Sequence, residues 1–222
     1  MKTDRFITLV WLVVFAVAIA VLAFPASRDR FAALTRSYPY LMGMLKIGIL
    51  GTMGELLGGR IVSGRWIVRG IRLHERFIVW AFLGIVFTAV FPLFSHGVDG
   101  LLRQGLLPGQ GSSFLGAFWK SFFMNIIFAF PMMTFHRFTD TLIGRGTLFG
   151  RWRVVETFTS IDWRNMFSIV AASCVWFWIP AQTVTFLLPP EFRIMSAAFL
   201  AIVLGFILGM AKRLSMKEAR LA

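Results

Sequence analysis

The sequence predicts an all-α protein, a polytopic transmembrane bundle of about six helices. Of its 222 residues 58% are hydrophobic and only 15% are charged, whereas soluble domains average about 25% charged residues. The apolar residues form six long runs, and the mean hydropathy is +0.76. Lys and Arg, which give a net charge of +13, fall mostly between these runs. We therefore interpret the basic residues as topology signals and not as a surface for nucleic acid.

Each run is close to the roughly 20 residues that cross a hydrocarbon core. The runs cover Phe6–Phe24, Pro39–Gly58, Phe77–Phe94, Leu115–Phe135, Met166–Leu188 and Ile194–Ala211. The first exceeds the 7–15 apolar residues of a secretory signal, so an uncleaved anchor is favoured over a cleaved signal. Pro92 and His96 are expected to mark the end of the third run. Pro189-Pro190 is expected to end the fifth, because a helix does not continue undisturbed through such a pair.

The segments between the runs indicate the orientation of the bundle. A polar, Gly- and Pro-rich loop covers 107–113, and a basic segment, 144–164, predicts a cytoplasmic connection with an interfacial amphipathic turn or helix. With the N-terminus inside, sixteen Lys and Arg residues fall on the inner side and five on the outer side. Because positive charge is retained in the cytoplasm, both termini are predicted to be cytoplasmic.

Small residues recur at helical spacing in two of the runs. In a bilayer, helices associate through close packing, which small side chains permit. The second run carries Gly48, Gly51, Gly54 and Gly58, and the sixth carries Ala201, Gly205 and Gly209. We expect both faces to be helix contacts, within the bundle or with a second copy of the chain.

Five polar residues inside the runs are candidates for lining a solute path. They are Lys46, Glu55, Lys120, Asn125 and Gln182. An ionisable group in a span costs several kcal/mol, so it usually faces a bundle interior or a water-filled cavity. In the predicted topology both lysines lie near the outer surface, where an anion path and snorkelling to the headgroups are equally compatible. The two amides line a hydrated path or hold helices together.

A second polar group lies at the inner end of the fourth run. Helical spacing brings Asp140 within reach of His136 and Arg137, which predicts a structural ion-pair cluster. Glu55 is expected to pair with His136 or Arg137, and a proton relay is the alternative. The chain has no metal-binding histidine spacing, nucleophile elbow or phosphate loop. The sequence therefore predicts no enzyme, no cofactor and no metal site, and an intramembrane enzyme that uses His136 and Asp140 ranks last.

Several short patterns follow one another in the order of a known family. They are Tyr38-Pro39, Lys46, Gly54-Glu55, Arg69, Arg72, Pro92, His96, Lys120, Pro131, Trp178-Ile179-Pro180-Ala181-Gln182, Thr185-Phe186, Pro189 and Arg193. The order resembles that of the four-span family of peroxisomal membrane proteins and mitochondrial inner-membrane proteins. The chain departs from the family at Glu55, where the family has aspartate, and at Met124-Asn125, where it usually has Asp-Gln.

The resemblance implies a bundle that gives small hydrophilic solutes a passive, weakly selective passage. It covers 38–213, so 1–37 is an N-terminal transmembrane anchor and connector and 214–222 a basic cytoplasmic tail. The alternative is a non-conducting structural or regulatory membrane protein that acts through helix packing and partner contacts. The expected partners are the lipid bilayer, small hydrophilic solutes and a second copy of the chain. A bacterial-type cytoplasmic membrane is favoured over an organelle membrane because no Arg- and Ser-rich leader is present.

Overall fold

The computed structural model describes residues 2–218, in which every regular element is a helix. The last four residues of the predicted tail, 219–222, lie outside this description. Within it, six helical segments are long and apolar enough to cross a membrane: Thr3–Ala23, Pro39–Ser63, Leu73–Arg103, Ser113–Arg145, Trp163–Leu187 and Pro190–Leu214. The predicted fold class, an all-α transmembrane bundle of six spans, is confirmed.

The third span is longer than predicted. The helix α4 (Leu73–Arg103) continues through Pro92 and His96, where the sequence pattern was expected to end it. Proline removes one backbone hydrogen bond, but the helix persists in a bilayer because no water competes for the remaining backbone groups. The expected end at Pro92 and His96 is therefore wrong.

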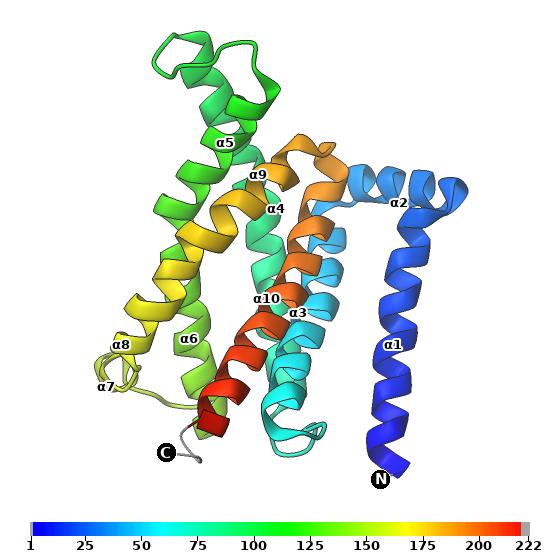
Figure 1. Cartoon of the computed structure of the whole chain (residues 1–222), viewed down its shortest axis with the longest axis vertical. Coiled ribbons are helices and arrows are strands. Elements are labelled where there is room, and N and C mark those ends of the chain that lie inside the picture. Colours follow the sequence, from blue (N-terminus) through cyan, green and yellow to red (C-terminus); the bar gives the residue numbers. More distant parts are fainter. Residues whose placement is uncertain (1, 219–222) are drawn as a thin grey trace.

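The first span stands beside the others and is attached by a few side chains. The helix α1 (Lys2–Ala23) runs along the bundle, and α2 (Pro25–Ser37) lies crosswise at its far end (Figure 1). No residue in the most apolar stretch of α1 is buried. One attachment is Trp11, whose Nε1 donates a hydrogen bond to the carbonyl of Met53 at 3.1 Å. Near its start, Asp4 accepts a hydrogen bond from the backbone N–H of Trp66 at 2.7 Å.

The centre of the bundle is α3 (Pro39–Ser63), which packs against α4 on one side and α10 (Pro190–Glu218) on the other. Its glycines allow both approaches. A Cβ atom on Gly51 would lie 2.6 Å from the ring of Trp80 on α4, and one on Gly54 would lie 3.1 Å from the Ala201 carbonyl on α10. The four glycines of the second predicted run thus contact two different helices. Gly48 and Gly51 face α4, whereas Gly54 and Gly58 face Ala201, Gly205 and Gly209.

The fourth and fifth spans contain wide, π-helical turns. One runs from α5 (Ser113–Phe123) through η1 (Met124–Ala129) into α6 (Phe130–Arg145). The other consists of α8 (Trp163–Asn165), η2 (Met166–Ala171), η3 (Cys174–Trp178) and α9 (Ile179–Leu187). Both η1 and η3 end two residues before a proline, Pro131 or Pro180. Proline leaves an earlier carbonyl without its donor, and a local shift to π-type bonding re-satisfies the backbone.

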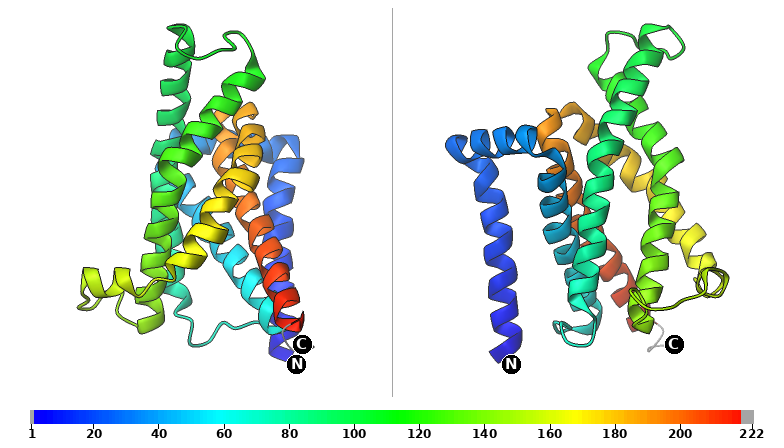
Figure 2. Two further views of the ribbon diagram at one scale, coloured as in Figure 1. Left: turned by 60° about the vertical axis from the view of Figure 1, so that its left-hand side comes forward. Right: turned by 180° about the vertical axis from the view of Figure 1, so that it is seen from behind.

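The two ends of the bundle differ in charge. The start of α1, the loop 64–72 and the segment 146–162, which includes α7 (Val154–Thr159), lie at one end, and α10 ends there too (Figure 2). This basic end carries the arginines Arg60, Arg65, Arg69, Arg72, Arg145, Arg151 and Arg153. The opposite end consists of α2, the loop 104–112 and the turn at residues 188–189. The segregation of arginines matches the loops that the sequence pattern assigned to one side.

Candidate functional site

A cavity of about 650 Å³ lies among the spans. Residues of α3, the loop 64–72, α4, η1, α6, η3, α9 and α10 line it. Towards the basic end its wall includes Ser63, Ile71 and Lys212, and in the middle of the bundle it includes Phe87 and Gln182. Most of the wall is apolar. Besides Thr52, Ser63 and Lys212, its polar residues form two groups, an ionic cluster (Glu55, Arg76, His136, Arg137 and Asp140) and an amide pair (Asn125 and Gln182).

Arg76 is the centre of the ionic cluster. Its Nη1 donates hydrogen bonds to Glu55 on α3 and, at 3.0 Å, to Asp140 on α6. The other oxygen of Glu55 accepts a hydrogen bond from Trp80 Nε1 at 3.0 Å. Asp140 also lies 3.8 Å from His136 Nδ1 and 4.0 Å from Arg137. One guanidinium on α4 therefore ties together carboxylates from two other helices.

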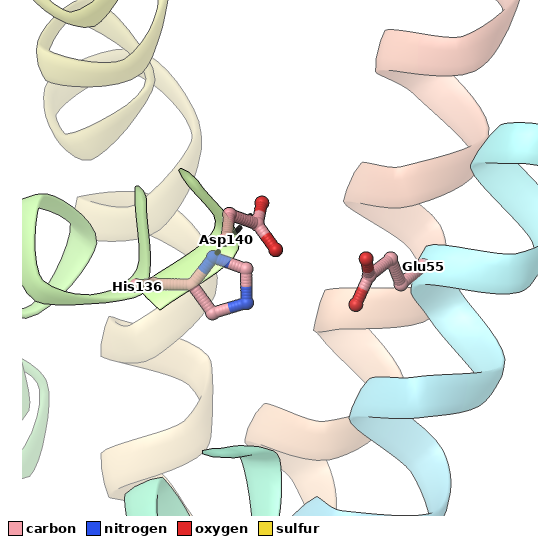
Figure 3. Close-up of side chains that lie close together, drawn as sticks. All are labelled: Glu55, His136 and Asp140. Carbon is pink, nitrogen blue, oxygen red and sulfur yellow. Dashed lines mark ion pairs between the residues drawn. The ribbon is translucent and has the colours of Figure 1, made fainter. Parts of the chain in front are cut away.

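The carboxylates and the imidazole of this cluster have the spacing of a metal site. Glu55 approaches from α3 and faces His136 and Asp140 on α6 (Figure 3), and one ligand atom of each lies within 4.8 Å of the others. However, Arg76 contacts both carboxylates and supplies the positive charge that a bound cation would bring. A metal ion would have to displace this guanidinium. We therefore assign the group to helix cross-linking by ion pairs.

The partner of Glu55 differs from the one expected. His136 or Arg137 was expected, and Arg76 takes that place. Arg76 directly precedes the predicted third run, Phe77–Phe94, so it was not among the polar residues predicted inside a span. The sequence did contain an indication of this contact. Arg76 and Trp80 are four residues apart, so their side chains share one helix face and can reach the same partner. The predicted trio of His136, Arg137 and Asp140 lies together, as helical spacing requires.

The amide pair lies deeper in the cavity. Asn125 on η1 is buried, and its Nδ2 donates to the carbonyl of Ser121 at 2.9 Å. The Ser121 hydroxyl in turn donates to the carbonyl of Ile179 at 2.7 Å, which joins α5 to α9. Gln182 on α9 is only 3% exposed, and its Oε1 has no hydrogen-bond partner among residues 2–218. A buried amide oxygen therefore lines the cavity with its acceptor capacity unused.

The two lysines predicted for a solute path lie outside this cavity. Lys46 is buried near the opposite end, where its Nζ donates to Thr35 Oγ1 at 2.8 Å and lies 4.4 Å from the centre of the Phe31 ring. Lys120 forms an ion pair with Asp99 at 2.8 Å. Each amine thus connects neighbouring helices. Of the five predicted path residues, the structure brings Glu55, Asn125 and Gln182 together around one cavity.

The chemistry available at this site is ion pairing and hydrogen bonding. The ionic cluster offsets its own charges, and the amide pair offers hydrogen bonds without an ionised group. Comparison with models of known protein families, with curated proteins and with solved structures gives no match for this chain. The case for its function therefore rests on the cavity and on the residues that face it.

Proposed function

We propose that this integral membrane protein gives small hydrophilic solutes a passive route across the bilayer, entered at the basic end. The observation that carries the proposal is the cavity of about 650 Å³ with polar residues of five spans in its wall. Polar groups inside a membrane are costly, and they typically mark solute or ion pathways. The cavity volume falls in the range of small-molecule sites. The motif order that resembles the peroxisomal and mitochondrial membrane protein family supports the same function.

The route is closed in this conformation by an apolar layer beyond the amide pair. Phe91 lies one turn beyond the cavity residue Phe87, and Phe186 lies one turn beyond Gln182. Both rings are buried, with centroids 5.2 Å apart. Apolar constrictions of this kind gate pores by excluding water. We propose that separation of Phe91 from Phe186 opens the route to the opposite end.

Solute flux into liposomes that contain the purified protein tests the proposal. Small uncharged and charged solutes should enter faster than into empty liposomes. Leu208→Trp places a large ring in the cavity wall, so it should reduce the added flux several-fold. Phe206→Trp is the matched control, because Phe206 lies on the same helix, is half exposed and does not line the cavity. Flux no greater than that of empty liposomes would refute the proposal.

A second candidate is a non-conducting structural membrane protein. It is favoured by the contacts that the ionisable groups make between helices. Lys46, Lys120 and Arg76 each join two or more helices. No residue of α2 or of the loop 104–112 lines this cavity, so it has no mouth at that end. The flux measurement separates the two candidates, because a non-conducting protein should give no flux above that of empty liposomes.

A further inference from the structure

We propose that the amide pair, Asn125 and Gln182, binds a small uncharged solute rich in hydroxyl groups, of the size of a four-carbon polyol. This inference rests on the proposed function and names the solute class of the same cavity. Three observations carry it: the unpaired oxygen of Gln182, the apolar residues beside the amide pair in the cavity wall, and the π-helical backbone that carries Asn125.

The oxygen of Gln182 requires a donor. A buried acceptor without a partner costs about 1–3 kcal/mol, so a native structure rarely leaves one unsatisfied without a reason. Gln182 Oε1 is such an acceptor, and its side chain lines the cavity. A bound solute that offers an O–H group would satisfy it. The side-chain oxygen Oδ1 of Asn125, which lines the same cavity, makes no hydrogen bond in the described part of the chain, so it offers a second acceptor.

The surroundings of the amide pair favour an uncharged solute. Apolar residues flank Asn125 in the wall, among them Met124 and Ala129, and Phe87 lines the same cavity. The ionic cluster lies towards the basic end, since eleven residues separate Asn125 from His136 along one helix, a rise on the order of 15 Å. Its charges are already paired with one another. An ionised solute at the amide pair would therefore lose its hydration without a counter-charge, which is costly.

The backbone around the pair is also unusual. Asn125 lies in the π-helical segment η1, and η3 ends four residues before Gln182. Single π-helical turns are rare and frequently occur at functional sites. Here each precedes a proline, and the two segments contact one another. The wide turns thus lie on both helices that present the amides.

Flux of erythritol and of its acid, erythronate, tests the solute class. We expect liposomes with the wild-type protein to take up erythritol at least about tenfold faster than erythronate, after subtraction of empty liposomes. Gln182→Met conserves volume but removes both hydrogen-bonding atoms, so it should reduce erythritol flux about fivefold or more. Thr183→Val is the matched control. It removes a buried hydroxyl from the same helix outside the cavity wall, and flux should be unchanged.

A binding measurement makes the inference independent of transport. In a Cys174→Ala background, Ala129→Cys places one thiol in the cavity wall, one turn from Asn125. Erythritol should slow the modification of this thiol by methyl methanethiosulfonate at least about twofold, and Gln182→Met should abolish the protection. Erythronate should not protect.

The outcomes separate the two proposals. If erythritol protects the thiol but does not enter the liposomes, the proposed passage is overturned and the amide site is supported. Flux of erythritol with no protection, or with protection that survives Gln182→Met, would overturn the amide site and leave the passage intact. Equal flux of erythritol and erythronate would also overturn the assignment of an uncharged solute.

Discussion

At the scale of single residues, Arg76 explains how two carboxylates are accommodated inside the bundle. Glu55 and Asp140 lie on different helices, and each is about one-quarter exposed. Without a cation between them, their charges would repel one another in a medium of low dielectric constant. The guanidinium is suited to this position because its fixed donors can reach both acids at once. The ionic cluster is therefore a cross-link that depends on one residue.

We expect Arg76→Met to lower the free energy of unfolding by about 2–4 kcal/mol, because it leaves two partly buried carboxylates without their partner. Titration with sodium dodecyl sulfate in mixed micelles, followed by tryptophan fluorescence, measures this change. Adding Glu55→Gln and Asp140→Asn to Arg76→Met should restore part of the loss. Arg69→Met is the control, since Arg69 is exposed on the loop and forms no ion pair among the described residues. An equal loss in both single variants would contradict the central role of Arg76.

At the scale of helices, the pairing of α3 with α10 depends on small residues that meet backbone to backbone. A Cβ atom on Gly205 would lie 2.6 Å from the carbonyl oxygen of Gly54. Neither helix can retreat far, because α3 is held on its other side by Trp80 and Phe77 of α4. Close packing of this kind is the main attraction between helices in lipid. The cavity wall includes Gly54 and Gly205, so the same contact shapes the site.

Gly205→Ala should lower the free energy of unfolding by about 1–3 kcal/mol, because the added methyl group overpacks the contact. Gly59→Ala is the matched control on α3. A Cβ atom there would meet nothing within 4 Å, so the free energy should be unchanged or raised by up to about 1 kcal/mol. The same detergent titration measures both variants. If the Gly205→Ala protein were as stable as the Gly59→Ala protein, α10 would be able to shift without a loss of stability, and the close contact would not be required.

At the scale of the whole molecule, arginines are concentrated at one end of the bundle. The basic end holds the loop 64–72 and the segment 146–162, whereas the opposite end holds α2 and the loop 104–112. Loops rich in Lys and Arg remain in the cytoplasm. We therefore propose that the basic end, and with it the entrance of the cavity, faces the cytoplasm.

Thiol labelling tests this orientation. Ser160→Cys at the basic end and Gln110→Cys at the opposite end are both exposed positions, introduced into the Cys174→Ala background. In intact cells, a membrane-impermeant maleimide should label Gln110→Cys and leave Ser160→Cys unlabelled. Permeabilised cells, where both should react, provide the control. The reverse pattern would invert the topology and move the cavity entrance to the outer face.

The sequence alone predicted the features that depend on local properties of the chain. A bilayer requires about 20 apolar residues per helix, so the six spans could be read directly from hydropathy. The same pattern identified Glu55, Asn125 and Gln182 as polar residues within spans. The helical content of the connector 25–37 was not anticipated, because amphipathic helices parallel to the membrane lack a long apolar run. There α2 buries Phe31 and Ala32 and exposes Arg28 and Arg30.

Only the tertiary structure decided which polar residues meet. Hydropathy locates a residue along a helix, but its neighbours depend on the rotation of each helix and on how closely the helices approach. Those rotations join Glu55 to Arg76, and they carry Lys46 and Lys120 away from the cavity. They also bring Asn125 and Gln182 into one wall. Thus the apolar runs determined the bundle, and the packing of its glycine faces determined the site.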